Sequence, residues 1–384
     1  MSLNAIIGDV HIGNSMAYGV VDSDGVNSRV KDFAKSFGFA IDESIKAGCT
    51  KIILTGDLFK NKKPTAVWID YFLGCVAKAV DVGIEVCIVS GNHDLLNAPR
   101  ITIMSAITKM GSNIKVYDDY GTYPIDDKYD CIICPYNDKN TLKLTSNEEV
   151  MKYISGKIKK ASSSTEKKKL AVVHGISSGT YLAKYEGAEV DTLMEPVYPL
   201  DLWTNNDIGY VFFGHVHKFS IIKKFKPTVV NVGSVDKSNF AEAGNNNKFV
   251  IFDTETEAIK YIDIPTREFL YIKGKIKSKK DFDSLLKMDV KTSITKIVLE
   301  VAEKLEHVIE LDKINKVLEE SYFNAGVVVN TTKEENAEDD VSYISECMTV
   351  RETLKEYLEK NFAKNNMESI YEKGVGIIEE VQEE

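Results

Sequence analysis

The sequence has little of what marks a membrane-bound or a secreted protein. Its 384 residues contain no apolar run that approaches the roughly 18 to 20 residues of a membrane span. An apolar stretch at residues 3–7 is typical of a core strand, which leaves no room for a signal peptide. Cysteine is scarce and falls mostly in apolar stretches, which favours reduced, buried thiols over a disulfide framework. We therefore expect a cytoplasmic protein without a membrane partner.

The sequence also lacks the net positive charge of a typical nucleic-acid-binding protein. Its formal net charge is −10, and phosphate groups need Lys and Arg to neutralise them. Residues 331–384 alone hold 15 acidic and 6 basic side chains, so the rest of the chain is nearly neutral. Within that rest, basic clusters occur at Lys60, Lys62 and Lys63, and at residues 157–169, 218–226 and 273–280. These clusters either bind a phosphate backbone or are solvated faces, which is the commoner role of such clusters.

Short runs of Val, Ile and Leu alternate with helical patterns, which is typical of an α/β fold whose strands are buried on both faces. Helical periodicity runs from Val30 to Ile45, and Pro64 is expected to open a second helix that continues through Val80. Strands are predicted at residues 3–7, 51–54, 85–89, 131–134, 170–173, 210–213, 221–225, 228–232, 249–252 and 259–264. Cys131 and Cys134 have the spacing of a zinc or redox pair, but their apolar surroundings favour a buried strand.

The pattern changes near Pro265, which predicts a domain boundary there. Residues 266–330 repeat a strand, helix, strand, helix, strand pattern that is small enough to form its own unit. Residues 331–345 include a polar, acidic run without apolar periodicity and are predicted to be a linker. Residues 346–384 carry an apolar helical stripe from Val350 to Phe362 and a second apolar group after it. The predicted organisation is thus a main domain at 1–265, a small α/β domain, a linker and a helical segment.

Histidine is rare, and its placement is the most informative feature of the chain. Only six histidines occur, and five fall just after predicted strands. Ligands collect at the carboxyl ends of strands in α/β sheets, so these five can converge on one site. They belong to five motifs: Gly8-Asp9-Val10-His11, Gly56-Asp57, Gly91-Asn92-His93-Asp94, His174-Gly175 and Gly214-His215-Val216-His217. One such histidine alone is more often a core or capping residue, but the joint pattern predicts a metal site, because imidazole and carboxylate suit Mn²⁺, Fe²⁺ or Zn²⁺.

At these five motifs the chain resembles the calcineurin-like metallophosphoesterase superfamily, over roughly residues 3–264. The resemblance implies a two-sheet sandwich flanked by helices that binds two divalent metal ions. Mn²⁺ is the expected metal, with Mg²⁺, Fe²⁺ and Zn²⁺ as alternatives. The resemblance implies that Asp57 bridges the two ions, the first held also by Asp9, His11 and His217 and the second by Asn92, His174 and His215.

The resemblance also implies catalytic roles beside the metals. His93 would be the acid that protonates or stabilises the leaving oxygen. Asp94 would either orient His93 or cap the turn. Such a site suits phosphodiester hydrolysis, because an anionic ester is a poor electrophile and two cations can activate water and neutralise the transition state.

Further segments are similar to the SbcD nuclease group of this superfamily: Arg29, Asp32 and Phe39, the run 56–59 with 63–65, and the run 231–235 with 240–242 and 249–251. That resemblance implies a DNA nuclease, acting as a double-stranded exonuclease and a single-stranded or hairpin endonuclease, in which 266–330 caps the site and selects DNA. It also implies a homodimer, through the helix at Pro64 to Val80 and one after Pro99, although the apolar face of such a helix more often belongs to the core. Residues 346–384 would dock on an SbcC-type coiled-coil ATPase, or pack back on the chain itself. One departure is Lys60, where many relatives have histidine.

Two other functions remain open from the sequence. The same metals would serve a small-molecule phosphodiesterase or phosphatase, because the motifs alone do not name a substrate. A non-catalytic scaffold that kept the fold is the third possibility, and the intact set of seven donor side chains argues against it.

Overall fold

The computed structural model describes residues 2–94, 111–180 and 195–332, together with a few isolated positions elsewhere. The chain divides into two compact units, Met1–Thr331 and Thr332–Glu384, and nearly all described residues belong to the first. The predicted acidic run at 333–340, the apolar stripe from Val350 to Phe362 and the proposed dimer helix after Pro99 lie outside the described residues.

The first of two six-stranded sheets has the strand order β14-β13-β1-β2-β3-β4. Strands β1 to β4 run parallel, while β13 is antiparallel to β1 and β14 is antiparallel to β13. The strands span Leu3–Ile7 (β1), Lys51–Leu54 (β2), Glu85–Val89 (β3), Ile114–Tyr117 (β4), Lys248–Asp253 (β13) and Ile259–Asp263 (β14).

The second sheet has the order β11-β12-β10-β7-β6-β5. Its four inner strands are parallel, and the two edge strands, β5 and β11, are antiparallel to their neighbours. The strands span Gly121–Pro124 (β5), Tyr129–Cys134 (β6), Lys168–His174 (β7), Ile208–Gly214 (β10), Ser220–Lys223 (β11) and Thr228–Asn231 (β12). A short parallel pair, β8 (Ile176–Ser177) and β9 (Val197–Tyr198), follows β7 and precedes the next helix.

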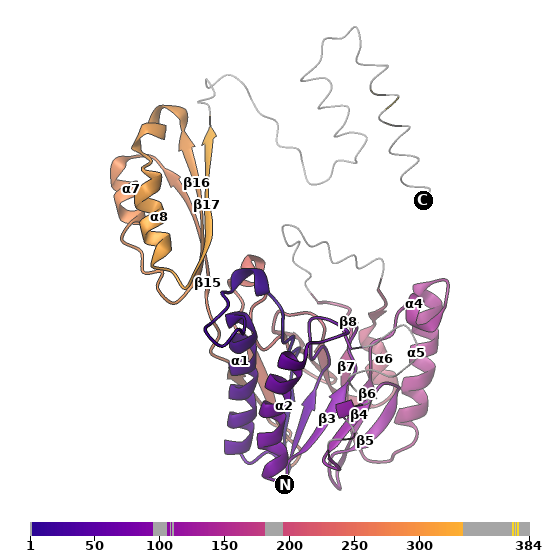
Figure 1. Ribbon diagram of the computed structural model, residues 1–384. Coiled ribbons are helices and arrows are strands. Elements are labelled where there is room, and N and C mark those ends of the chain that lie inside the picture. The colour runs from indigo at the N-terminus through magenta and orange to yellow at the C-terminus, as the bar shows by residue number, and fades with distance from the viewer. Residues whose placement is uncertain are drawn as a thin grey trace. The chain divides into compact units, whose positions relative to one another are not determined.

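The two sheets pack face to face and are covered by helices on their outer faces (Figure 1). Along β1, Ile6 belongs to the cluster between the sheets, while Ile7 belongs to the cluster under the helices. Because both faces are buried, apolar residues occupy consecutive positions of the inner strands rather than alternate ones, with exceptions such as the buried Asn4 in β1. The covering helices are α1 (Ser28–Lys46) and α2 (Ala66–Asp81) on the first sheet, and α5 (Asn147–Ser162) and α6 (Leu200–Asn205) on the second; α4 (Lys139–Leu142) precedes α5. The predicted two-sheet sandwich flanked by helices is confirmed.

Most predicted elements are present, with shifted limits where side chains decide the ends. Helix α2 begins at Ala66 rather than at Pro64, because the Thr65 side chain accepts a hydrogen bond from the backbone N–H of Trp68 and caps the helix. Strand β11 ends at Lys223, so Phe225 was wrongly included in it; the Phe225 side chain is 81% exposed. Strands β4 and β5 were not predicted.

Residues 269–332 form a three-stranded sheet with the order β15-β16-β17. Its elements are β15 (Phe269–Ile276), α7 (Lys279–Leu285), β16 (Ile294–Ala302), α8 (Leu311–Glu319) and β17 (Phe323–Thr332). Both helices pack on one face (Figure 1), where Phe282 and Ile314 join Ile297 and Leu299 in a separate hydrophobic cluster. The opposite face, called the open face here, is formed by side chains that include Tyr271, Lys273, Lys275, Val298, Glu300 and Asn330. The boundaries at 265 and 330 remain predictions.

The five cysteines that the structure describes behave as buried apolar residues. Cys131 and Cys134 both lie on β6, as predicted, and both are inaccessible to solvent. Cys131 belongs to the cluster between the sheets and Cys134 to the cluster under α5 and α6, so the two thiols point to opposite faces of the sheet and do not share a site. In the parts of the chain that the structure describes, no helix has both the length and the apolar composition needed to traverse a lipid bilayer.

Candidate metal centre

The five histidine and aspartate motifs converge at the carboxyl ends of parallel strands from both sheets. Asp9 and His11 follow β1, Asp57 follows β2, and Asn92 and His93 follow β3 of the first sheet. From the second sheet, His174 ends β7, while His215 and His217 follow β10. The structure therefore brings together all seven predicted metal ligands and the predicted acid, as the sheet geometry requires of strands whose carboxyl ends meet.

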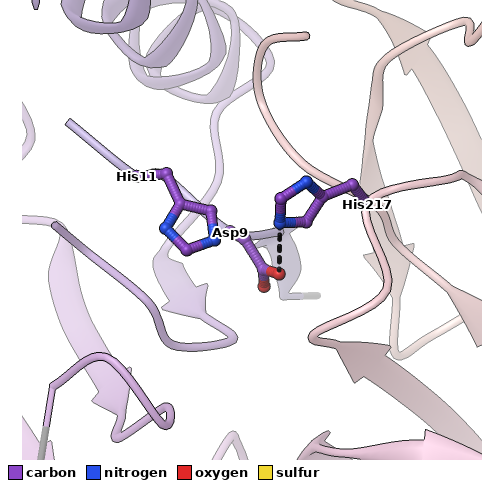
Figure 2. A group of neighbouring side chains, drawn as sticks. All are labelled: Asp9, His11 and His217. Carbon is purple, nitrogen blue, oxygen red and sulfur yellow. Dashed lines mark ion pairs between the residues drawn. The ribbon is translucent and has the colours of Figure 1, made fainter. Parts of the chain in front are cut away.

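The first group of donors consists of Asp9, His11 and His217, whose ligand atoms all lie within 4.8 Å of one another. Figure 2 shows the two imidazole rings on either side of the Asp9 carboxylate, with His217 Nε2 3.9 Å from Asp9 Oδ2. The Asp9 side chain is fully buried and accepts hydrogen bonds from the backbone N–H of His215, at 3.0 and 2.9 Å to its two oxygens. The second sheet thus fixes a carboxylate that belongs to the first.

The second group consists of Asp57, His174 and His215, again with ligand atoms within 4.8 Å of one another. Asn92 completes it, because Asn92 Oδ1 lies 3.0 Å from His174 Nε2 and 3.2 Å from His215 Nδ1. Asp57 Oδ2 lies 3.5 Å from His174 Nε2 and 3.4 Å from His11 Nε2. Asp57 therefore lies between the two groups.

Three histidines each use one ring nitrogen for a partner outside the two groups. His174 Nδ1 donates to the carbonyl oxygen of Thr55 at 2.8 Å. His215 Nε2 is 2.8 Å from Glu195 Oε2, and His217 Nδ1 is 2.8 Å from Glu242 Oε1. Carbonyl and carboxylate oxygens only accept, so the N–H of each neutral ring points outward. Neither glutamate was predicted to contact the site.

The consequence is a surplus of lone pairs inside the site. When neutral, with its N–H on Thr55, His174 would present a bare Nε2 to Asn92 Oδ1 and Asp57 Oδ2, and neutral His215 would likewise present a bare Nδ1 to Asn92 Oδ1. His11 Nδ1 is buried without a hydrogen-bond partner among the described residues. Acceptors that face one another in a buried space are unfavourable unless a cation lies between them. The donor set, oxygen and nitrogen of mixed type, fits a pair of divalent metal ions.

The charge balance of the site gives the same result. Among the described residues, the ion pairs of Asp9 and Asp57 are all with histidines, and none is with lysine or arginine. Burial raises the pKa of Asp9. Burial also opposes ionisation of Asp57, but His174, His11 and His93 outweigh it and hold the pKa of Asp57 well below its ordinary value. Two buried carboxylates without a permanent cation beside them are costly, and bound metal ions would neutralise them.

The family model of the calcineurin-like phosphoesterase superfamily domain matches residues 4–257, the span that holds both donor groups. The chain belongs to this superfamily. Two relatives of the phosphoesterase have informative names, one as an exonuclease subunit and the other as a DNA repair protein. The "Exonuclease subunit 1" of Enterobacteria phage T4 is 29% identical over 280 residues, 70% of this chain and 73% of the relative. The "DNA double-strand break repair protein Mre11" of Methanocaldococcus jannaschii is 25% identical over 292 residues, 71% of this chain and 70% of the relative.

Among solved structures, a dimetal phosphatase from Danio rerio is similar to the phosphoesterase with a TM-score of 0.39 and 9% sequence identity. The similarity covers 69% of this chain and 99% of that structure's chain.

The backbone of the phosphoesterase site is tightly constrained. Three site residues other than glycine have positive φ values: 48° at His11, 51° at Asp57 and 92° at His215. Such conformations cost about 1–3 kcal/mol each and persist where the surroundings enforce them, often at functional sites. Gly91 shows how closely the backbone approaches, since a Cβ there would lie 2.2 Å from Asp57 Oδ1. A side chain at Gly91 would therefore displace the central carboxylate.

Asp94 and His93, the two predicted catalytic residues, have different surroundings. The Asp94 carboxylate is buried and accepts three backbone N–H groups, from Asp57 at 2.7 Å, Gly91 at 2.9 Å and Leu58 at 3.0 Å. These contacts favour turn capping over orientation of His93. Burial and the nearby Asp57 raise the pKa of Asp94 to about 7.

His93 lies at the edge of the first donor group. Its backbone N–H donates to Asp57 Oδ1 at 2.8 Å, and its ring centroid is 5.1 Å from that of His11. The side chain is only partly buried, and this burial lowers its pKa despite the opposing effect of Asp57. The His93 imidazole therefore lies beside the donors but belongs to neither of the two donor groups.

Proposed function

We propose that this phosphoesterase is a two-metal DNA nuclease, the nuclease subunit of an SbcCD-like DNA repair and processing complex. It hydrolyses phosphodiester bonds as a double-stranded exonuclease and as a single-stranded or hairpin endonuclease, with Mn²⁺ as the preferred metal and Mg²⁺, Fe²⁺ or Zn²⁺ as alternatives. The observation that carries the proposal is the convergence of seven donor side chains on one site. The chain also aligns, over about 70% of its length, with one relative named as an exonuclease subunit and one named as a DNA double-strand break repair protein.

The open face of the sheet β15 to β17 supports DNA over a small molecule as substrate. Lys273 Nζ lies 4.7 Å from the centre of the Tyr271 ring, and Lys296 Nζ lies 5.9 Å from it. The face contains a shallow groove of about 390 Å³, lined also by Lys275 and Asn330. Lysines neutralise phosphates and an aromatic ring offers a stacking surface, so the face suits a polyanionic strand. On this basis residues 266–330 act as the cap that selects DNA.

Each residue of the site has a role in this proposal. Asp9, His11 and His217 hold one ion, while Asn92, His174 and His215 hold the other. Asp57, which lies between the groups, serves both. Bound divalent cations supply Lewis-acid activation of water and neutralise charge on the phosphorus centre. His93 delivers a proton to the leaving oxygen from beside His11, and Asp94 holds the turn that carries Asp57 and Gly91.

The test uses the full chain with Mn²⁺ and three DNA substrates: linear double strands, single strands and hairpins. The His93→Ala variant should bind Mn²⁺ as the wild type does but cleave DNA about 10²- to 10⁴-fold more slowly. Asn92→Ala should weaken Mn²⁺ binding and cleavage together. His307→Ala is the matched control, because His307 lies in the short helix Glu303–Val308, outside both donor groups, and its loss should change neither. DNA cleavage that is absent from the wild type, or equal in His93→Ala, refutes the proposal.

The alternative is a small-molecule phosphodiesterase or phosphatase that uses the same donors. It predicts rapid turnover of nitrophenyl phosphate esters or cyclic nucleotides, with no preference for DNA. In that case substitution of Lys273 and Lys296 by Ser would leave kcat/KM unchanged, whereas a nuclease should lose DNA affinity in a salt-dependent way.

Two partners belong to the proposal. The name of the phage relative is that of one subunit of an exonuclease, which supports docking of residues 346–384 on an SbcC-type coiled-coil ATPase. The proposal also includes a homodimer. A pull-down with the complete chain should recover a large coiled-coil ATPase, and deletion of residues 341–384 should abolish this recovery. Light scattering after gel filtration measures the mass of the particle, and a monomer at micromolar concentration would contradict the dimer.

A further inference from the structure

Among the residues that the structure describes, the outward nitrogen of His217 contacts Glu242. His217 Nδ1 lies 2.8 Å from Glu242 Oε1, while His217 Nε2 faces Asp9 Oδ2 at 3.9 Å (Figure 2 shows the Asp9 side). The Glu242 carboxylate is 6% exposed, so water does not compete effectively for it. In metal sites, a carboxylate on the far nitrogen of a histidine fixes the ring orientation and raises its basicity. The geometry of Glu242 matches this arrangement.

Glu242 is itself fixed by a short segment rather than by a long helix. It ends the single helical turn Phe240–Glu242, and its Oε2 accepts from the backbone N–H of Ser238 at 2.7 Å. The Ser238 hydroxyl in turn accepts from Asn14 Nδ2 at 2.8 Å. Residues 238–242 are therefore tied to the loop that follows His11, and the position of Glu242 depends on this segment.

The same segment contacts the first strand of the small sheet through aromatic rings. The ring of Phe240 lies 5.1 Å from that of Phe269 in an edge-to-face arrangement, and the Tyr18 ring lies 5.5 Å from Phe240 and 5.4 Å from Phe269. These three residues form what we call the aromatic joint. Phe269 begins β15, and Phe240 is two positions before Glu242. The contact between these two rings therefore links the small sheet to the segment that carries the Glu242 carboxylate.

A series of ion pairs near the aromatic joint also links the segment before Glu242 to the residues that precede β15. The buried Arg29 donates to Asp236 at 3.2 Å and to Asp32 at 2.7 Å. Arg267, at the start of the small sheet, donates to both oxygens of Asp32 at 2.7 and 2.8 Å. The segment that leads to Glu242 is therefore anchored near the small sheet at two adjacent points, since the Arg29 guanidinium also lies 5.5 Å from the centre of the Phe269 ring.

We propose that Glu242 is a positioning residue for His217. Through the aromatic joint, the orientation of His217 then depends on how residues 266–330 pack against residues 238–242. This inference rests on the proposed function, since it takes His217 as a metal ligand. Its consequence is that a strand bound to the open face and a metal ion bound at Asp9, His11 and His217 influence each other, because coupling between two ligands is reciprocal.

The experiment measures Mn²⁺ binding to the metal-free full chain by titration calorimetry, with the electron paramagnetic resonance of free Mn²⁺ as an independent readout. Glu242→Ala should weaken one of the two binding events by about 10- to 100-fold and leave the other unchanged. Glu242→Gln keeps the volume but has only one acceptor oxygen for the contacts with Ser238 and His217, so it should weaken the same binding event without leaving a cavity. Glu257→Ala is the matched control, since Glu257 accepts from Tyr129 and Tyr210 outside both donor groups.

The joint is tested by a double-mutant cycle with Phe269→Ala. This substitution should weaken the same binding event in the wild-type background and have no further effect in Glu242→Ala. Additive effects, or unchanged affinity in Phe269→Ala, overturn the joint, and unchanged affinity in both Glu242 variants overturns the whole inference. His217→Ala separates the two proposals: if it loses one binding event while Glu242→Ala does not, only the inference fails, whereas if it retains both, the assignment of His217 in the proposed function fails. Unfolding curves identify any variant that has not folded, in which case Glu242→Gln decides.

Discussion

Replacement of Arg29 by methionine should be among the most destabilising single changes in the chain. Arg29 and Asp236 are both fully buried and lie 3.2 Å apart, and Arg29 also donates to Asp32 and to the carbonyl oxygen of Lys237. Methionine fills a similar volume but leaves Asp236 as a buried carboxylate without a cation. Breaking a buried ion pair from one side costs about 3–5 kcal/mol, and we expect a loss of that size in the free energy of unfolding.

The loss should depend on pH in a defined direction. Burial raises the pKa of Asp236, while Arg29 lowers it, so removal of Arg29 should raise this pKa further. An acid whose pKa is higher in the folded state than in the unfolded state destabilises the fold as the pH rises through the folded value. The difference between the Arg29→Met variant and the wild type should therefore be smaller at pH 5 than at pH 8.

The assay is urea unfolding in the presence of a chelator, so that metal binding does not contribute. Fluorescence reports on the fold because Trp68 and Trp203 are both buried in helices on the sandwich. Lys275→Met is the control: its ion pair with Glu300 is largely exposed, and its removal should change stability by less than about 0.5 kcal/mol. A loss below about 1 kcal/mol for Arg29→Met, or an equal loss at both pH values, would refute the reasoning.

Three further outcomes follow from the site and the core. Mn²⁺ at 100 times its dissociation constant should raise the free energy of unfolding by about 2.7 kcal/mol for each site it fills, with reversal by chelator and a smaller shift in Asp57→Asn, which weakens both sites; calorimetric or urea unfolding measures this. Gly91→Ala should lower stability by about 1–3 kcal/mol and weaken Mn²⁺ binding, because the new Cβ meets Asp57, whereas Gly156→Ala on α5, where a Cβ meets open space, should do neither. Cys131→Ser should leave the zinc content unchanged by elemental analysis, while burying a hydroxyl costs about 1–3 kcal/mol; a loss of zinc would contradict the strand assignment.

The strands that carry the site were predictable because they are buried on both faces. Strands β1, β2 and β3 have the predicted limits, since Leu3–Ile7, Lys51–Leu54 and Glu85–Val89 each contain consecutive apolar residues, with one polar residue per strand, and end at turns. Strand β4 at the edge of the first sheet has one buried residue, and β5 contains both Gly121 and Pro124. Edge strands need neither continuous apolar runs nor residues of high strand propensity, so their sequence gives a weak signal.

The metal donors of the site could be predicted from the sequence, whereas the glutamates that contact its histidines could not. Histidine is rare in this chain, so five histidines after strands form a pattern that chance seldom gives. Glu195 and Glu242, in contrast, are two of 58 acidic residues. What makes them partners of His215 and His217 is the folding of distant loops, and no local spacing encodes it. Asp94 lies between these cases: the sequence indicated its neighbourhood, and only its three backbone contacts favour one role over the other.

The donor set is divided between the two sheets, with Asp9, His11, Asp57 and Asn92 on one and His174, His215 and His217 on the other. Neither sheet alone offers a complete coordination shell to either ion. A nascent or partly unfolded chain whose sheets have not yet joined would thus be unable to attack a phosphodiester. Cleavage activity would therefore require that both sheets have folded and joined, which protects DNA, the proposed substrate, from an incompletely folded enzyme.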